Sequence, residues 1–493
     1  MHTDRFTPLD AATLLRWMQH DLPNKQLFGI DRELFFMPKP DDPFRMERYG
    51  KVLETPLGVA AGPHTQLAQN ILSAWLCGAR YIELKTVQVL DELNVAKPCI
   101  DMADEGYNCE WSQELKLDQS FEEYLKAFVL LYVLRDMLNL PVEAEPGKGP
   151  GFIFNMSAGY NLEGIKSPAL QRFLDRMENA EEDVKRIKAG LAPLYPAIEK
   201  MPIPARLSDN LTVSTMHGCP PDEVESIGRY FITERKYNTA IKLNPTLLGP
   251  ERLRDILNTQ LGYDVCVPDE AFGHDLKYND GVAIIRNLAA AAETAGVAFG
   301  LKLTNTLETA NEKQNLPRSE GMVYMSGRSL HPISINLAER LQQEFDGKLD
   351  IAFSAGVDTF NVADTLACGL RPITMSSDIL KPGGYGRLHQ YLDTLRAEMR
   401  KAGAHTIAEW EKSRSPIAGN PGFANLVSYA AAVLGKHSRY HKERFPYVSV
   451  KTERPLPRFD CAAAPCMSGC PAEQDIPRYL DAVARGDFEL AWR

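Results

Sequence analysis

Three features on which whole classes of protein depend are missing from this 493-residue sequence. Crossing a bilayer takes about 20 consecutive apolar residues, and the longest apolar stretches here, such as Ala127–Val133, are far shorter. The first residues, Met1-His-Thr-Asp-Arg-Phe6, are polar, and no apolar segment of a secretion signal follows them. Lys and Arg number 55 against 65 Asp and Glu, so the basic face that binds nucleic acid is not expected. We therefore expect a cytoplasmic protein whose partners are neither membranes nor nucleic acids.

Fixed-period repeats and low-complexity tracts are absent from the sequence as well, which argues against solenoids and fibrous arrays. Apolar residues make up 44% of the chain, enough for a sizeable core and too many for global disorder. The length allows two or three ordinary domains, or one large barrel with additions.

Short apolar runs alternate with amphipathic helical patterns from residue 57 onward. The candidate strands are Leu57–Ala61, Tyr81–Lys85, Phe152–Met156, Leu211–Thr215, Ala240–Leu243, Ala298–Leu303, Asp350–Ser354 and Pro372–Met375. The helical patterns between them include Gln66–Cys77, Pro221–Lys236, Gly281–Ala295, Ile333–Phe345 and Phe360–Cys368. This alternation predicts parallel β/α units. Eight such units suit an α/β fold of the (β/α)8 or TIM-barrel type with helical insertions, and a doubly wound sheet is the alternative.

The spacing of these runs also suggests domain boundaries. We expect an N-terminal extension over residues 1–50 and the barrel over residues 51–390. Insertions are expected at about 87–150 and 158–210, with helices near Phe121–Leu138 and Glu181–Lys188. Residues 391–455 are helical and then Pro-rich, as in a connector, and residues 456–493 form a separate tail.

That tail holds three of the nine cysteines within ten residues: Cys461, Cys466 and Cys470, the last followed directly by Pro471. Closely spaced thiolates with a trailing Pro are typical of iron–sulfur ligands, which normally number four per cluster. Disulfides are not expected in a reducing cytoplasm. Zinc sites usually have two residues between paired cysteines, whereas the gaps here are four and three. We interpret the run as an incomplete iron–sulfur ligand set, with zinc as the alternative.

Small and polar residues gather where the predicted strands end, which is where barrel enzymes place their chemistry. These residues are Ala61, Gly62, Lys85, Thr86, Asn161, Lys242, Asn305, Gly356, Ser376 and Ser377. The ends of the seventh and eighth strands match the common phosphate site of barrels, where backbone amides can hold a phosphate. The pattern predicts a phosphorylated, ring-bearing cofactor. FMN fits it, and pyridoxal phosphate is the alternative, because several lysines could form its Schiff base.

Cys219 follows the fourth predicted strand and precedes Pro220-Pro221 at a helix start. A helix N-terminus is expected to lower the pKa of a thiol, and His217 could donate or accept a proton beside it. A buried structural cysteine is an equally good interpretation. We interpret the remaining cysteines as structural or incidental: Cys77, Cys99, Cys109, Cys266 and Cys368.

Several of these segments resemble the FMN barrel of dihydroorotate and dihydropyrimidine dehydrogenases. They are Gly58–Thr86, Ser214–Pro221, Lys242–Thr246, Thr304–Thr306 and Gly356–Ser377. Nearly the whole chain is similar to the family of proposed selenate reductase iron–sulfur/flavin subunits, through stretches such as Ala61–Asn70, Ser214–Pro220 and Lys242–Gly249. The resemblance implies an FMN-type barrel and a flavin-dependent oxidoreductase.

The resemblance also implies roles for single residues. Ala61, Gly62, Lys85, Thr86, Asn161, Lys242 and Asn305 would contact FMN or substrate, and Gly356, Ser376 and Ser377 would take the FMN phosphate. Lys242 would lie near the N1/O2 end of the flavin ring. Cys219 would donate the proton that completes reduction of a substrate double bond. The loop departs from the dehydrogenases, whose motif is Asn-Leu-Ser-Cys-Pro, because Met216 stands three places before Cys219.

The tail resembles the start of the iron–sulfur domain of dihydropyrimidine dehydrogenase and of the small glutamate synthase subunit. The leading cysteine of that domain corresponds to Arg458, and its further ligands would lie beyond Arg493. The resemblance therefore implies a truncated domain, with [4Fe-4S] clusters expected only in a longer chain or complex. Electrons would come from a NAD(P)H/FAD unit elsewhere, since no Gly-rich dinucleotide motif follows a predicted strand here.

The expected activity is reduction of an unsaturated, N-heterocyclic small molecule. The alternative is a non-catalytic electron-transfer or assembly subunit of a multi-subunit reductase, linked to selenate or to a molybdenum hydroxylase. Whether the protein forms a homodimer is left open.

Overall fold

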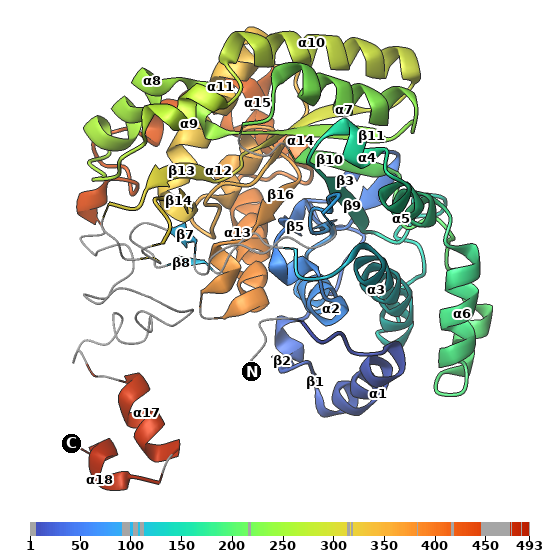
Figure 1. The fold of residues 1–493 in the computed structure, drawn as a ribbon. Coiled ribbons are helices and arrows are strands. Elements are labelled where there is room, and N and C mark those ends of the chain that lie inside the picture. The colour runs from blue at the N-terminus through green and yellow to red at the C-terminus, as the bar shows by residue number, and fades with distance from the viewer. Residues whose placement is uncertain are drawn as a thin grey trace.

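The computed structural model of the chain describes residues 6–90, 99–101, 107–108, 113–214, 218–312, 316, 319–381, 383–415, 419–444, 474, 476–484 and 486–492. Eight parallel strands close into a barrel at the centre of the molecule (Figure 1). In chain order they are β5 (Leu57–Val59), β6 (Tyr81–Glu83), β9 (Ile153–Ala158), β10 (Asn210–Ser214), β11 (Asn238–Leu243), β12 (Phe299–Leu303), β15 (Ile351–Phe353) and β16 (Ile373–Met375). Each predicted strand overlaps one of these, and β16 pairs with β5 to close the ring. The predicted (β/α)8 barrel is confirmed.

The barrel strands are apolar runs because both of their faces are covered. β9, for example, is buried along its whole length, as expected for a parallel strand with helices outside and packed side chains inside. The covering helices are α2 (Ala68–Leu76), α7 (Pro221–Thr233), α10 (Tyr278–Ala295), α11 (Leu330–Glu344), α12 (Val362–Ala367) and α13 (Arg387–Lys401). α7 shows why they form where they do: Pro221 occupies the first helical position, and Val224, Ile227 and Phe231 face the core.

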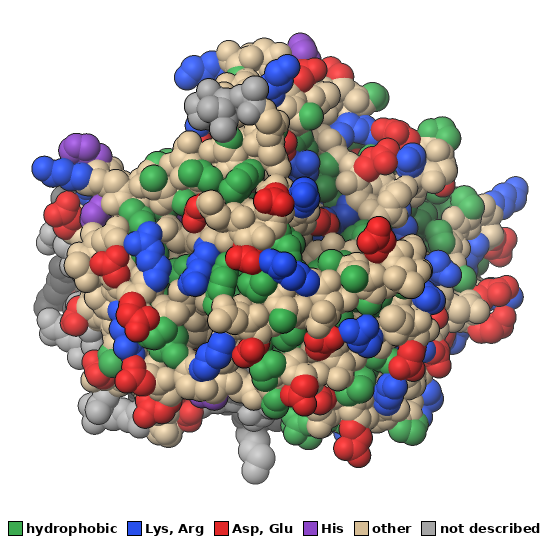
Figure 2. All heavy atoms as spheres, turned by 90° about the horizontal axis from the view of Figure 1, so that it is seen from above, with side chains coloured by type: hydrophobic (Ala, Val, Ile, Leu, Met, Phe, Trp, Pro, Cys, Tyr) green, Lys and Arg blue, Asp and Glu red, His purple; other side chains and the backbone are tan. Residues whose placement is uncertain are grey.

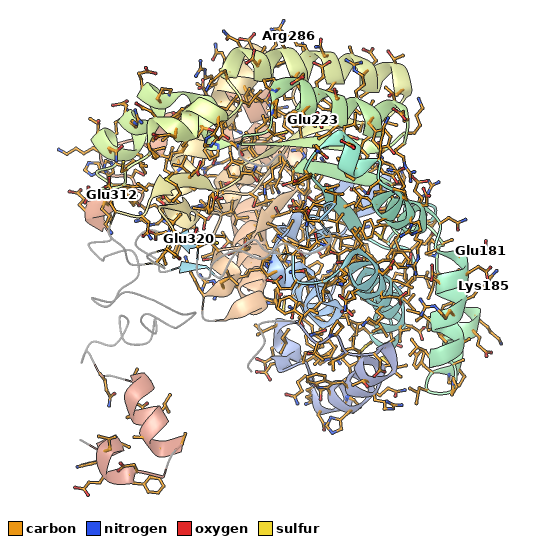
Figure 3. All side chains as sticks on the ribbon, in the orientation of Figure 1. Glu181, Lys185, Glu223, Arg286, Glu312 and Glu320 are labelled. Atoms are coloured by element: carbon orange, nitrogen blue, oxygen red, sulfur yellow. The ribbon has the colours of Figure 1, made fainter. Side chains whose placement is uncertain are left out.

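The two insertions and the N-terminal segment add a second helical layer beside β5, β6 and β9 (Figure 1). Its helices are α1 (Ala11–Asp21), α3 (Leu117–Met137), α4 (Leu162–Ile165), α5 (Pro168–Glu178) and α6 (Glu181–Leu191). α3 is buried over most of its length and packs on α2 and α5. On the exposed side of α6, Lys185 pairs with Glu181 at 2.8 Å (Figure 3). Helices were predicted in both insertions, and α3 and α6 are found there.

The remaining elements are short. β1 (Gln26–Leu27) pairs with β2 (Ile30–Asp31), and β3 (Met46–Arg48) pairs with β4 (Lys51–Leu53). α8 (Pro250–Arg254) and α9 (Asp269–His274) follow β11. α14 (Ile407–Arg414) and α15 (Pro421–Ala432) pack on α12, and α15 also packs on α11. This part of the expected connector therefore lies against the barrel. α17 (Ile476–Ala484) and α18 (Phe488–Trp492) pack on each other.

A small four-stranded sheet that the sequence did not reveal lies beside the carboxyl ends of the barrel. Its order is β13 (Leu307–Ala310), β14 (Met322–Met325), β7 (Ile100–Asp101) and β8 (Tyr107–Asn108). β14 runs parallel to β7, so the segment after β12 is joined to the insertion after β6. Strands of two to four residues carry too little alternation of polar and apolar residues to be recognised from sequence.

The surface carries mixed charge. Figure 2 shows one face of the molecule, on which Lys and Arg side chains are interspersed with Asp and Glu. Among the described residues, no helix combines the length and the apolarity needed to cross a bilayer.

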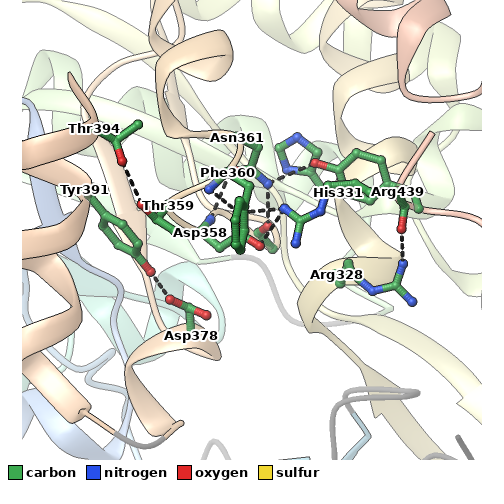
Figure 4. Close-up of polar contacts among 12 residues, drawn as sticks. Arg328, His331, Asp358, Thr359, Phe360, Asn361, Asp378, Tyr391, Thr394 and Arg439 are labelled. Atoms are coloured by element: carbon green, nitrogen blue, oxygen red, sulfur yellow. Dashed lines mark hydrogen bonds and ion pairs between the residues drawn. The ribbon is translucent and has the colours of Figure 1, made fainter. Parts of the chain in front are cut away.

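The helices after the barrel are tied to it through a buried histidine (Figure 4). His331 of α11 lies 2.7 Å through Nδ1 from the carbonyl oxygen of Ala355 and 3.0 Å through Nε2 from the hydroxyl of Tyr429. A carbonyl can only accept, so Nδ1 carries the proton and Nε2 accepts from Tyr429. The ring of Tyr440 stacks on the imidazole with centroids 5.1 Å apart. Burial lowers the pKa of His331 to about 3.

This pKa predicts how stability depends on pH. Unfolded chains protonate His331 below its ordinary pKa of about 6.5, whereas the folded protein keeps it neutral down to about pH 3. Folding therefore loses stability as pH falls through this window. We expect the stability advantage of the wild type over His331→Gln, measured by denaturant unfolding, to shrink by roughly 2 kcal/mol between about pH 7.5 and about pH 5. Parallel stability curves for the two proteins would contradict this assignment.

Candidate functional site

A cavity of about 290 Å³ lies at the carboxyl ends of the barrel strands, and segments at the ends of all eight strands line it. The small sheet supplies part of its wall through β7 and β14. The lining comprises Ala60–Pro63, Lys85, Thr86, Gln88, Ile100, Gln113, Gly159, Ser214, Lys242, Thr304–Thr306, Tyr324, Ser326, Gly327, Leu330, Ser354–Val357 and Thr374–Asp378. Catalytic sites of TIM barrels lie at this face, which makes the cavity the candidate site.

Most of the cofactor residues predicted from sequence meet in this cavity. Ala61, Gly62, Lys85, Thr86, Lys242, Asn305, Gly356, Ser376 and Ser377 all line it. Asn161 is not part of the lining. Its Oδ1 accepts a hydrogen bond of 2.8 Å from the amide of Gly164 and so caps α4. Capping is a common use of Asn, and it engages the side chain that was expected to contact the cofactor.

Charged side chains form a layer in the barrel beneath the cavity. Glu83, at the end of β6, accepts through Oε1 from the ammonium group of Lys302 and, at 2.9 Å, from the hydroxyl of Thr374. Its Oε2 accepts from the amide of Ala61 at 3.3 Å. Glu83 is 4% and Lys302 1% exposed. Barrel interiors are normally filled by branched apolar residues, so a carboxylate and an ammonium group here are unusual.

Lys242 belongs to the same layer, directly beside Lys302 on the neighbouring strand. Burial lowers the pKa of Lys242 to about 8, with the charge of Lys302 acting in the same direction and that of Glu83 opposing it. Burial also lowers the pKa of Lys302. A pKa of about 8 leaves the lysine at the cavity wall mostly cationic at pH 7.

His64 follows the first barrel strand and folds back over Gly62. A Cβ atom at Gly62 would lie 2.8 Å from its ring, so a larger residue there would have to displace the imidazole. Burial, followed by the charge of Lys85, lowers the pKa of His64 to about 4, and the imidazole is neutral at physiological pH. Its Nε2 is buried and has no hydrogen-bond partner among the described residues.

The loops after β15 and β16 form another part of the cavity, with hydroxyl groups and close backbone contacts. Gly356 has a φ of +54°, and a Cβ atom there would lie 2.2 Å from the carbonyl oxygen of Gly327. The hydroxyls of Ser326 and Ser377 are 2.9 Å apart. Ser376 and Ser377 are partly exposed to the cavity. These groups are of the kind that bind phosphate oxygens.

A network of polar contacts holds the loop of Gly356 (Figure 4). Asn361 donates to the carbonyl oxygen of Gly356 at 3.0 Å and to the hydroxyl of Tyr440 at 2.9 Å. Arg439 donates to Asp358 at 2.7 Å, and its own carbonyl accepts from Arg328. The residues after α15 thus fix the position of this loop.

The small sheet and the segment after β6 place further polar groups on the cavity wall. The Oε1 atom of Gln88 accepts from the amide of Leu90 at 2.6 Å, which fixes the orientation of the side-chain amide. Gln88 lines the cavity, and its Nε2 is buried and has no partner among the described residues. Burial raises the pKa of Tyr324 to about 12, so this phenol is a neutral donor. A ligand with hydrogen-bond acceptors suits this wall.

Cys219 lies outside the large cavity, in a separate pocket of about 10 Å³ that Asn244 and Asp275 also line. Asn305, which lines the large cavity, donates to Asn244 at 2.6 Å, so this Asn pair separates the two spaces. The expectation of a lowered thiol pKa is wrong. Burial, with the acidic residues Glu223 and Asp222 in the first turn of α7, raises the pKa of Cys219 to about 11 (Figure 3). His217 lies outside the described residues.

Several groups at this site were not predicted from the sequence: Glu83, Lys302, Thr374, Gln88 and Tyr324. Two of them had a visible signal, because Glu83 and Lys302 interrupt apolar strands at the level of the strand ends. Gln88 and Tyr324 reach the cavity from irregular segments whose course only the folded chain shows.

No group of three or more His, Cys, Asp or Glu residues in the described part of the chain is arranged to hold a metal ion. The predicted iron–sulfur ligands Cys461, Cys466 and Cys470 lie outside the described residues.

Two solved structures are among those with some similarity to this chain. A ligand-free DHODH from Eimeria tenella is 17% identical with a TM-score of 0.45, and the match covers 76% of this chain and 92% of that one. A DHODH from the same organism in complex with ferulenol is 15% identical with a TM-score of 0.45, covering 83% and 96%.

Sequence comparison is more specific. The chain is 41% identical over 477 residues to the protein described as "Putative oxidoreductase YgfK" in Escherichia coli K12, and equally to its counterpart in Escherichia coli O157:H7. The matches cover 92% of this chain and 44% of each relative, so the chain spans less than half the length of these relatives. Residues 28–418 match the family model described as "Oxidoreductase YgfK, N-terminal TIM-barrel domain". The chain therefore belongs to the YgfK family of oxidoreductases and carries its N-terminal TIM-barrel domain.

Proposed function

We propose that this chain is an FMN-dependent oxidoreductase module that reduces an unsaturated, N-heterocyclic substrate. The observation that carries the proposal is the composition of the large cavity. Lys242 lines it from β11 and Lys85 from the segment after β6, while Gly356, Ser376 and Ser377 line it from the segments after the adjacent strands β15 and β16. Cationic groups suit the electron-rich edge of a flavin ring, and the last two strand ends suit its phosphate.

The residues present fit FMN in three respects. A Cβ atom at Gly356 would clash with the backbone of Gly327, and one at Gly62 would meet the ring of His64, so both glycines lie in close contact with other parts of the cavity wall. Ser376 and Ser377 line the same cavity as Gly356. The lysines supply positive charge without a matching number of carboxylates in the lining, where Asp378 is the one acidic residue among those described. Pyridoxal phosphate would need a Schiff-base lysine, and membership of an oxidoreductase family favours FMN.

When bound, FMN supplies hydride-transfer chemistry, and the chain's own residues supply binding, orientation and a proton. Lys242 would place its charge at the ring, and the Ala61 amide is held by Glu83. Gln88 Nε2 would donate to an acceptor on the substrate. The raised pKa of Cys219 keeps its thiol protonated at neutral pH, which is the form that a proton donor needs.

The electron source is the second part of the proposal. Electrons would arrive through [4Fe-4S] clusters from a NAD(P)H/FAD unit, with Cys461, Cys466 and Cys470 supplying some of the cluster ligands. The relatives are more than twice as long as the matched region, which supports the presence of such a unit in the longer protein or in a partner chain.

One observation favours a second function. Cys219 lies behind the Asn244–Asn305 pair rather than in the large cavity, and a reductase that lacks a proton donor at the flavin would serve only to carry electrons. In this alternative the chain is an electron-transfer or assembly subunit of a multi-subunit reductase.

The absorbance spectrum of the purified protein tests the cofactor. We expect the visible bands of an oxidised flavin, bleaching on reduction, and release of FMN rather than FAD on denaturation. A colourless protein that takes up no added FMN would contradict the proposal. A borohydride-stable adduct on a lysine would instead identify pyridoxal phosphate.

Gly356→Ala tests the phosphate loop. The added Cβ would meet the Gly327 carbonyl at 2.2 Å and must displace the loop, so we expect FMN affinity to fall at least tenfold by fluorescence titration. Gly296→Ala is the matched control, because Gly296 has a φ of +71° and a Cβ added there would have no atom within 4 Å. The control should lose roughly 1 kcal/mol of stability from the left-handed backbone and keep its FMN affinity. If the two changes affected FMN affinity equally, the phosphate would not bind at the Gly356 loop.

Cys219→Ala separates the two functions. In the catalytic function, reoxidation of the reduced flavin by a panel of unsaturated N-heterocycles should slow by about 10²–10⁴-fold, with FMN affinity unchanged and partial activity in Cys219→Ser. Stopped-flow absorbance measures this rate. An unchanged rate in Cys219→Ala would favour the electron-transfer subunit.

A further inference from the structure

The buried pair of Glu83 and Lys302 is the least expected feature of the barrel interior. The ammonium group of Lys302 contacts both Glu83 Oε1 and the hydroxyl of Thr374, and that hydroxyl also donates to Glu83 Oε1 at 2.9 Å. The three groups form a closed triangle between β6, β12 and β16.

Stability alone does not explain this triangle. Taking two charges out of water costs more than their attraction returns in many proteins, and apolar replacements of similar size are often neutral or stabilising. The usual occupants of this position in a barrel are branched apolar residues. A buried ion pair at the strand ends is therefore expected to serve the cavity that lies above it.

Each member of the triangle is connected to the lining of the large cavity. Thr374 lines it directly. Glu83 uses its second oxygen to accept from the amide of Ala61, another lining residue. Lys302 lies in register with Lys242, so two ammonium groups stand side by side on adjacent strands and share the field of one carboxylate.

We propose that Lys302 and Glu83 are positioning residues for the cofactor. The two residues hold the Ala61 amide and set the electrostatic potential at the cavity floor. That potential in turn sets the preference of the site for reduced over oxidised FMN. This inference rests on the proposed function, in which FMN occupies the cavity. It assigns a role to two residues that need not touch the cofactor themselves.

The two charges should act in opposite directions. Reduced FMN carries a negative charge on its pyrimidine side near neutral pH, and nearby protein charges tune this form. Removing the cation in Lys302→Met should lower the ratio of affinities for reduced and oxidised FMN about tenfold, which for a two-electron couple lowers the midpoint potential by about 30 mV. Removing the anion in Glu83→Gln should raise the ratio by a similar factor.

The experiment measures the FMN midpoint potential and the dissociation constant of oxidised FMN for the wild type and both variants. Lys126→Met is the matched control, since Lys126 is also a buried lysine paired with a glutamate, Glu123, but it stands on α3 outside the barrel. We expect opposite shifts for the two variants and no shift for the control, whatever its effect on stability.

Shifts of the same sign in both variants, or none in either, would overturn the inference. If a single variant does not fold, the charge-neutral double variant Lys302→Met with Glu83→Gln is measured instead. Its affinity ratio should lie within about a factor of three of the wild-type value, because the two effects cancel, and a tenfold shift would overturn the inference. A wild type that binds no FMN would refute the proposed function rather than this step.

Discussion

Closure of the barrel between β16 and β5 is the contact on which the whole site depends. It sets Thr374 beside Gly58 in register, and a Cβ atom at Gly58 would lie 1.9 Å from the Tyr81 carbonyl of the next strand. The absence of a side chain there lets β5 lie close against β6 while it pairs with β16. Closure then brings Thr374 and Glu83 to the same Lys302, although they stand on strands far apart in sequence.

The strands could be predicted because burial on both faces requires continuous apolar runs, and all eight were recognisable on that basis. The wall formed by β7 and β14 could not, since those strands are two and four residues long and are joined only by long-range pairing. Cys219 shows a different limit. Its place at a helix start was evident, but the sign of its pKa shift depends on burial and on the neighbouring carboxylates.

Asn161 and Asn305 show how one residue type at equivalent places can take different roles. Both follow barrel strands, yet Asn161 turns its side chain back to cap α4, whereas Asn305 faces the cavity and binds Asn244. The difference follows from what comes next in the chain: a helix begins directly after Asn161, while Thr306 and β13 extend the chain after Asn305. A polar residue at a strand end is therefore a good candidate for a site residue only when the segment that follows does not use its side chain, for example as a helix cap.

The contacts around His331 link the cavity end of the barrel to the segment that follows it. Tyr440 stacks on His331 and receives a hydrogen bond from Asn361, which also holds the carbonyl of Gly356 (Figure 4). The chain therefore passes next to the proposed phosphate loop at residue 440. The geometry of the Gly356 loop is thus coupled to the position of the chain at residue 440 through one shared set of hydrogen bonds.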